Sequence, residues 1–181
     1  MCIRDRPGAE TRLDALDFGI PQSIGEFAVT AFPTSHDAPG SCGFRLDAAG
    51  GAVGVLTDTG YVTDEAADIL EGVDLAVLEA NHDMETLRSG PYPYYLKQRI
   101  LGAQGHLSNE DAARFAAVLA QSGTSEIILA HLSRENNTPA MAQTAVERAL
   151  SAAGVSPLLS VAPRDCLGPA HTVSRRSVCR R

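Results

Sequence analysis

The chain has 181 residues, of which 44% are apolar and 20% are charged, and its formal net charge is −7. This composition is typical of a soluble globular domain or of most of a larger one. The sequence contains no apolar run of about 18 residues, so we expect no membrane span, and no basic leader with an apolar core predicts secretion. The acidic balance argues against a general nucleic-acid coat, although it does not exclude a local basic groove.

The four cysteines are Cys2, Cys42, Cys166 and Cys179. They form no Cys-x-x-Cys pair, and two of them stand near the ends of the chain. This usage favours free thiols in a reducing cytoplasm over a disulfide framework. We therefore expect a cytoplasmic protein.

Both ends of the chain differ from its middle. Residues 1–13 have neither alternation nor an apolar face, and residues 166–181 are polar and basic without periodicity. We expect a disordered or non-native leader, a domain over residues 14–165 and a disordered basic tail.

Paired strands are predicted first along the chain. Residues 27–32, FAVTAF, alternate in polarity and predict a strand, and residues 43–57 predict two strands that meet at a hairpin turn, Gly50-Gly51. Residues 64–72 predict a short helix that Gly72 closes, and residues 74–80 predict a buried strand.

Helices and strands then alternate. Ser108 can cap a helix over NEDAARFAAVLAQSG, and Thr138-Pro139 can begin another that runs to about Ala153. The other predicted elements are a short helix over 94–101 and strands over 126–130 and 158–162. This order predicts a layered α/β (α+β) domain with a mixed sheet. No predicted helix precedes the first strands to cover a sheet face, so we expect the domain to be incomplete at its amino end.

Four polar residues share one position, after a strand or turn and before the next turn or helix. They are His36, Asp58, His106 and His131. In α/β folds, ligands bind outside the carboxyl ends of the strands, so residues distant in sequence can meet there. Imidazole and carboxylate are suitable ligands for a divalent metal, and a carboxylate can bridge two ions.

Each of these residues also has an ordinary explanation. A single histidine after a strand is usually a hydrogen-bonded surface or core residue, and Asp58 in LTDTG could simply form a turn. His82 and Asp83, in EANHD, could join the same cleft or make hydrogen bonds at a strand end. The basic residues Arg88, Lys97 and Arg99 are most simply solvated surface charges. No nucleophile elbow, phosphate-binding loop or dinucleotide fingerprint is present.

Consecutive blocks of the chain resemble the metallo-β-lactamase-fold hydrolases, most closely their WalJ/YycJ branch. The blocks are SHDAPGSCGFRL, GVLTDTGYVTDE, LAVLEANHD, GPYPYYLKQRILGAQGHLSNEDAA and LAHLSRENNTP, and they lie between residues 14 and 165. The resemblance implies an αββα sandwich with a two-metal site between its sheets. The chain would form only a part of this sandwich.

The resemblance also implies roles for individual residues. His36 would be a terminal ligand of one metal and His131 of the other, with Asp58 as the bridging carboxylate of the catalytic site. His106 would stabilise or protonate a group near the scissile phosphate. Glu79 and the segment NHD that follows, Asn81, His82 and Asp83, would support the ligands or face the substrate.

One element of the family pattern is absent from the sequence. The family's His-x-His-x-Asp-His motif would precede His36, which is the first histidine of the chain. The full-length enzyme would hold two divalent ions, zinc or manganese, and hydrolyse phosphodiesters as an exonuclease-like enzyme acting on DNA, RNA or a small phosphodiester. With an incomplete site, we expect this chain to be inactive alone.

Two alternatives remain open. The chain could be a catalytically dead α/β fragment that acts only by self-association, as a homo-oligomer, or by partner binding through an open sheet edge. It could also be a β-lactamase acting on small amides, but the GHLSNED and HLSRENN blocks fit the phosphodiesterase side of the superfamily better.

Overall fold

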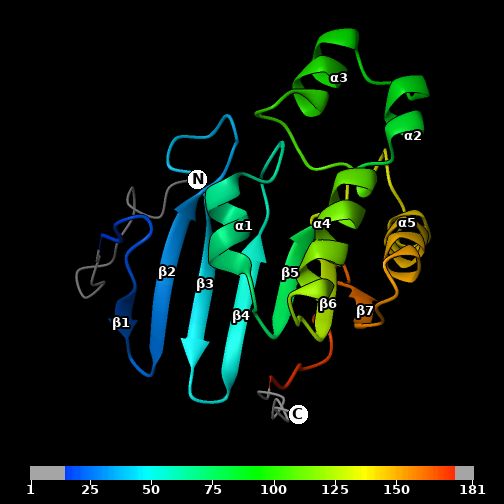
Figure 1. Ribbon diagram of the computed structural model, residues 1–181. Coiled ribbons are helices and arrows are strands. Elements are labelled where there is room, and N and C mark those ends of the chain that lie inside the picture. Colours follow the sequence, from blue (N-terminus) through cyan, green and yellow to red (C-terminus); the bar gives the residue numbers. More distant parts are fainter. Residues whose placement is uncertain (1–14, 174–181) are drawn as a thin grey trace.

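A single mixed sheet forms the centre of the protein (Figure 1). The computed structural model describes residues 15–173, and within them seven strands lie side by side in chain order. Strands β1 to β4 pair antiparallel, whereas β4 to β7 pair parallel. Their bounds are β1 Gln22–Ile24, β2 Phe27–Pro33, β3 Cys42–Ala48, β4 Gly51–Leu56, β5 Leu75–Glu79, β6 Glu126–Ala130 and β7 Leu158–Val161. The predicted mixed sheet and the hairpin of β3 and β4 are therefore confirmed.

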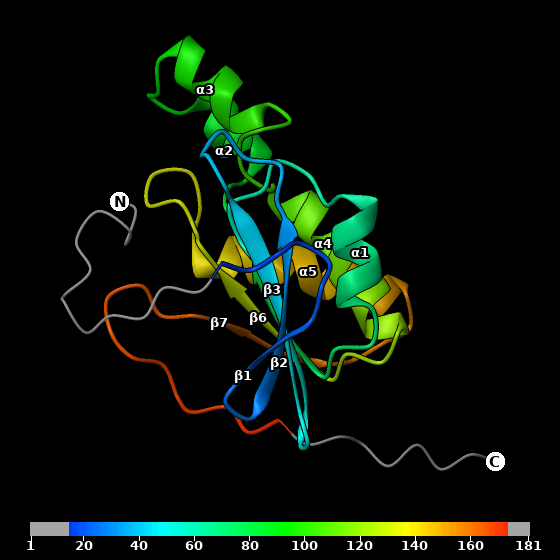
Figure 2. The same ribbon diagram turned by 90° about the vertical axis from the view of Figure 1, so that its left-hand side faces the viewer.

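Three helices cover one face of this sheet (Figure 2), namely α1 Asp64–Leu70, α4 Asn109–Gln121 and α5 Pro139–Ala152. Two further helices, α2 Met84–Ser89 and α3 Tyr94–Leu101, project beyond the end of the sheet at which β4, β5 and β6 finish (Figure 1). The sequence did not predict β1 or α2. Both elements are too short to show a clear period in the sequence.

The helices begin where the sequence predicts them to begin. The Ser108 hydroxyl accepts the Asp111 N–H at 3.1 Å, and the Thr138 hydroxyl accepts the Met141 N–H at 3.2 Å. Pro139 follows as the first residue of α5, where its missing N–H removes no helical hydrogen bond. The Ser108 cap starts α4 at Asn109, shortly after His106.

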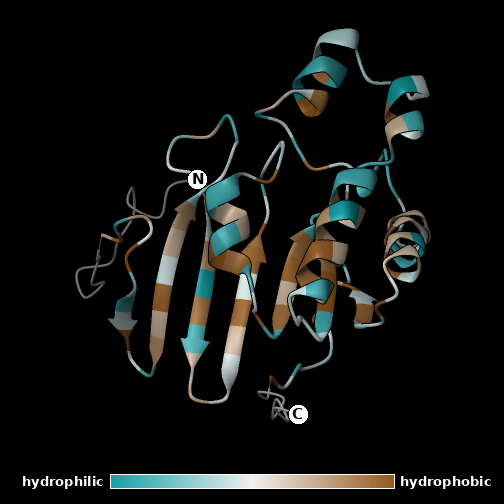
Figure 3. Ribbon diagram, in the orientation of Figure 1, coloured by the Kyte–Doolittle hydropathy of each residue, from teal (hydrophilic) through white to brown (hydrophobic). Residues whose placement is uncertain are grey.

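The two faces of the sheet differ in their cover. Leu56, Leu78 and Leu129 point to the helices, are at most 1% exposed and belong to the main core. On the opposite face, the register brings Phe44, Val55 and Val77 side by side, and all three are only half-buried. Within residues 15–173, no helix lies over this second face (Figure 2), although its strands are largely apolar (Figure 3). A second sheet, as in an αββα sandwich, is not among the described residues.

The predicted leader, 1–13, lies outside the described residues, as does the tail from residue 174 onward. Residues 166–173 form no helix or strand, and His171 Nδ1 lies 2.5 Å from Glu126 Oε1. In the described part of the chain, every helix is too short or too polar to cross a membrane.

Candidate metal centre

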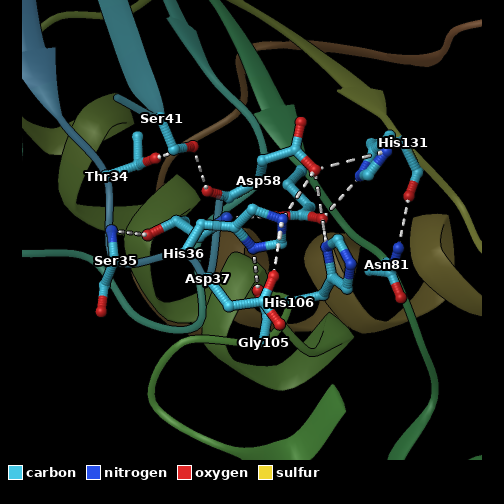
Figure 4. A network of polar contacts seen from close by, with 12 residues as sticks. Thr34, Ser35, His36, Asp37, Ser41, Asp58, Asn81, Gly105, His106 and His131 are labelled. Atoms are coloured by element: carbon cyan, nitrogen blue, oxygen red, sulfur yellow. Dashed lines mark hydrogen bonds and ion pairs between the residues drawn. The ribbon is translucent and has the colours of Figure 1, made fainter. Parts of the chain in front are cut away.

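The carboxyl ends of four strands bring five predicted site residues together (Figure 4). His36 follows β2, Asp58 follows β4, Glu79 ends β5 and His131 follows β6, while His106 lies in the loop before α4. Parallel strands direct their carboxyl ends to one edge of the sheet, which is where α/β proteins bind ligands. The structure thus joins residues that are separated by almost a hundred positions in the sequence.

The donor atoms are close enough to share a cation. Asp58, Glu79, His106 and His131 each offer a ligand atom, and these atoms all lie within 4.8 Å of one another. His36 joins them, because its Nε2 is 3.7 Å from Asp58 Oδ1. His131 Nε2 is also 3.7 Å from the same oxygen. Both distances are too long for a hydrogen bond and leave the carboxylate between two imidazoles.

Hydrogen bonds fix which nitrogen of each imidazole faces Asp58. His36 Nδ1 lies 2.9 Å from the carbonyl oxygen of Gly105, so Nδ1 donates there and Nε2 is the nitrogen that faces Asp58. His131 Nδ1 lies 2.7 Å from Glu79 Oε1, which has the same effect on the second ring. This is the arrangement by which proteins orient metal-binding histidines.

Glu79 is the buried acceptor that organises the cluster. It is 0% exposed, and its Oε1 accepts from His131 and, at 2.8 Å, from His106 Nδ1. Its Oε2 accepts the Thr59 N–H at 3.0 Å. Burial alone would raise the pKa of Glu79, but these three hydrogen bonds outweigh it and hold the pKa below its ordinary value. The hydrogen bond to Glu79 raises the pKa of His131, against the opposing effect of burial.

Two of the five residues have an unusual backbone. Asp58 has φ of 56° and His131 has φ of 58°, and they are the non-glycine residues with positive φ in the described part of the chain. Such conformations cost about 1–3 kcal/mol each and concentrate at functional sites. Here they turn the chain sharply after β4 and β6, which directs both side chains toward the same point.

The third imidazole borders a cavity. The His106 ring centroid is 4.9 Å from that of His36 and 5.2 Å from that of His131. Because Glu79 binds its Nδ1, the Nε2 of His106 is the nitrogen left for a ligand. His106 and His36 line a cavity of about 280 Å³, whose other wall includes Tyr92, Leu96 and Ile100 of the α3 region.

His82 and Asp83 do not join the cluster. Asp83 caps α2, because its Oδ1 accepts the Thr86 N–H at 2.8 Å. His82 is 1% exposed, and neither of its ring nitrogens has a partner among the described residues. Burial lowers the pKa of His82 to about 4, so the ring is neutral at pH 7.

Asn81 contributes to the site, and it is one of the residues for which the resemblance implies a supporting role. Its side-chain amide donates to the His131 carbonyl at 2.9 Å, and its own carbonyl accepts the Ser133 N–H at 2.8 Å. Both bonds hold the strained turn that carries His131, and Figure 4 shows the first of them.

The donor set fits a borderline divalent cation. Imidazole and carboxylate are ligands that zinc takes in proteins, and both also suit manganese. The imidazoles are oriented by part-buried hydrogen bonds to Glu79 and to the Gly105 carbonyl, which is the kind of support that metal-binding histidines have.

Comparison with known proteins shows the family of the chain. The model of the beta-lactamase superfamily domain matches residues 2–132. Exodeoxyribonuclease WalJ of Streptococcus pneumoniae serotype 2 (strain D39 / NCTC 7466) is 42% identical over 137 residues, which are 76% of this chain and 51% of that relative. Exodeoxyribonuclease YycJ of Bacillus anthracis is 38% identical over 136 residues, covering 75% and 52%. The chain therefore spans about half the length of these relatives.

A solved structure shows the same fold. The metallo-beta-lactamase fold protein YhfI from Bacillus subtilis superposes with a TM-score of 0.66 at 19% identity, over 88% of this chain and 56% of that one. The fold, the family match over most of the chain and the relatives agree. The chain belongs to the beta-lactamase superfamily domain family.

Proposed function

We propose that this chain supplies part of a two-metal centre that hydrolyses phosphodiester bonds of DNA, as an exonuclease. The observation that carries the proposal is that His36 Nε2 and His131 Nε2 each lie 3.7 Å from one oxygen of Asp58. Relatives of this chain at 38–42% identity are named exodeoxyribonucleases, which supports DNA over RNA or a small phosphodiester.

The proposed ligand roles follow from these distances. His36 would bind one ion, His131 the other, and the Asp58 carboxylate would bridge them. When bound, two divalent cations activate a water molecule and neutralise charge on the phosphate oxygens. Zinc and manganese are the ions that we propose, because of the imidazole and carboxylate donors.

The proposed proton transfer uses Glu79 and His106. Glu79 holds His106 by Nδ1, which leaves Nε2 as the nitrogen that would give a proton to a molecule in the cavity that His106 lines. A leaving oxygen bound there could accept that proton, which is the usual task of a general acid. The full burial of Glu79 keeps water from competing for Nδ1.

The number of ligands limits what this chain does alone. His36, Asp58 and His131 cannot complete the coordination of two ions, since each ion takes about four or more ligands. We therefore expect weak metal binding and no useful hydrolysis by residues 1–181 alone. Incubating the chain with a generic phosphodiester and zinc or manganese checks this; turnover that Asp58→Ala abolishes would contradict it.

A chimera tests the function itself. It joins the part of the pneumococcal relative that precedes the matched segment to this chain at residue 14. We expect manganese- or zinc-dependent release of nucleotides from labelled DNA, abolished by Asp58→Ala and retained by Asp83→Ala, because Asp83 only caps α2. Equal activity of the Asp58→Ala chimera would rule out the proposed centre.

A second candidate function is binding without catalysis. The half-buried apolar face that includes Phe44, Val55 and Val77 favours self-association, because apolar surface of this kind is usually covered. Metal content and oligomeric state separate the two functions: bound zinc or manganese in a defined ratio supports the first, and a metal-free dimer supports the second. We place either activity in the cytoplasm, from the use of cysteine.

A further inference from the structure

The α2–α3 lobe, residues 84–105, is charged differently from the rest of the protein. It contains Arg88, Lys97 and Arg99 against one carboxylate, Glu85, a formal charge of +2, whereas the whole chain carries −7. The lobe projects from the edge of the sheet that holds the metal centre (Figure 1). Because the rest of the protein is acidic, a polyanion would be attracted to this lobe rather than to other parts of the surface.

The lobe is firmly tied to the loop that carries His36. Arg99 Nε donates to Asp37 Oδ2 at 2.5 Å, the Asp37 N–H donates to the Gln104 carbonyl at 3.1 Å, and the Ser35 hydroxyl donates to the Ala103 carbonyl at 2.6 Å. A molecule bound to the lobe is therefore held at a defined position relative to the metal ligands.

One side of α3 faces the cavity beside the centre. Leu96, Arg99 and Ile100 recur at helical spacing and line the cavity of about 280 Å³, together with Tyr92 and His106. Tyr92, Leu96 and Ile100 form the apolar part of this lining, and the rest is polar, with His36, Asp37, Asn81 and Gln104 among it. The volume is near the lower limit of about 300 Å³ for small-molecule pockets. A nucleoside, which combines a flat ring with several polar groups, is the ligand that we match to this mixed lining.

Two exposed tyrosines begin α3 but occupy different sides. Tyr95 is 74% exposed and stands four residues before Arg99, so helical geometry places it beside Arg99, which lines the cavity. Tyr94 is 77% exposed and stands two residues before Leu96, so helical geometry places it on the side away from the cavity. Exposed aromatics beside basic residues are the usual platform for stacking single-stranded bases.

From these observations we propose that the α2–α3 lobe binds the end of a DNA single strand, with the terminal nucleoside in the cavity and the next base stacked on Tyr95. This inference rests on the proposed nuclease function, because it places the strand end next to the metal centre. In the described part of the chain, the terminal nitrogens of Arg99 have no protein acceptor, which leaves them for a backbone phosphate.

The test measures binding without hydrolysis. Fluorescence anisotropy follows a labelled single strand of about 12 nucleotides added to the full chain in EDTA, so that no turnover occurs. We expect Tyr95→Ala to weaken binding by about 5- to 100-fold, the loss of one stacked base. Tyr95→Phe keeps the ring and is expected to bind within about twofold of wild type.

Tyr94→Ala is the matched control, because it removes an equally exposed tyrosine from the same turn of the helix. It is expected to change the affinity by less than about twofold. Equal losses for the two alanine variants, no measurable binding by the wild-type chain, or equal binding of a blunt duplex would each overturn the proposal. Failure of the chimera to degrade DNA, with this binding pattern intact, would refute the nuclease function alone.

Discussion

Glu79 Oε1 and His131 Nδ1 lie 2.7 Å apart although they are 52 residues apart in the sequence. The same oxygen accepts from His106 Nδ1, so one buried carboxylate positions two imidazoles of the centre. The site is therefore organised from inside the protein, at the ends of adjacent parallel strands β5 and β6.

Glu79→Gln should weaken metal binding while the chain still folds. A glutamine amide cannot accept from both imidazoles and from the Thr59 N–H, so at least one of the three groups loses its partner. Loss of such a supporting residue typically costs about 10- to 100-fold in metal affinity. Calorimetric titration with zinc measures this change.

The matched control for that variant is Glu85→Gln, which makes the same chemical change at an exposed position of α2. We expect its zinc affinity to equal that of the wild type. If both variants bound zinc like the wild type, Glu79 would have no supporting role.

Asp58→Asn should remove the stabilisation that metal gives without harming the metal-free fold. Asparagine tolerates the left-handed backbone that Asp58 adopts, and it is nearly the same size. An ion present at about a hundred times its Kd should stabilise the wild type by about 2.7 kcal/mol. Urea unfolding with and without zinc should show this gain in the wild type alone; an equal gain in Asp58→Asn would exclude the bridging role.

Gly60→Ala should disturb the centre through backbone contact. A Cβ at this position would overlap the carbonyl groups of Gly102 and Ala103, in the loop whose Gly105 carbonyl orients His36. Overpacking of this kind typically costs about 1–3 kcal/mol in folding free energy, and here we also expect lower zinc affinity. Gly50→Ala is the control, since its Cβ would meet its nearest atom at 3.4 Å. Unchanged stability in Gly60→Ala would show that the loop moves freely.

His82 should make the fold sensitive to mild acid. Its pKa is about 4 in the folded chain against 6.5 as the ordinary value, so between these values the unfolded chain binds the proton and the folded chain does not. Its contribution to stability is therefore complete above pH 6.5 and is lost as the pH falls toward 4, by about 3 kcal/mol in total.

Comparison with His82→Leu isolates that effect, because other groups also titrate in this range. Urea unfolding of both chains in EDTA, between pH 7 and pH 4, should show a steeper loss of stability in the wild type. Parallel curves for the two chains would show that the proton on His82 is not responsible.

Much of the fold could be predicted from local sequence. The alternation in β2, the glycine pair between β3 and β4, and the Ser108 and Thr138 caps each act over a few residues, and the structure confirms them. The short α2 and β1 left no such pattern. The untested boundaries at residues 13 and 166 stay predictions.

The sequence by itself determined which polar residues follow the buried strands, because an apolar run that stops at His or Asp is a local feature. It also placed Glu79, His82 and Asp83 in one candidate group, since they are near neighbours after one strand. Only the tertiary structure separated them. Parallel pairing of β5 with β6 joins Glu79 to His131, while His82 turns into the core and Asp83 caps α2. Side-chain direction and long-range strand pairing decide these contacts, and neither is encoded in local spacing.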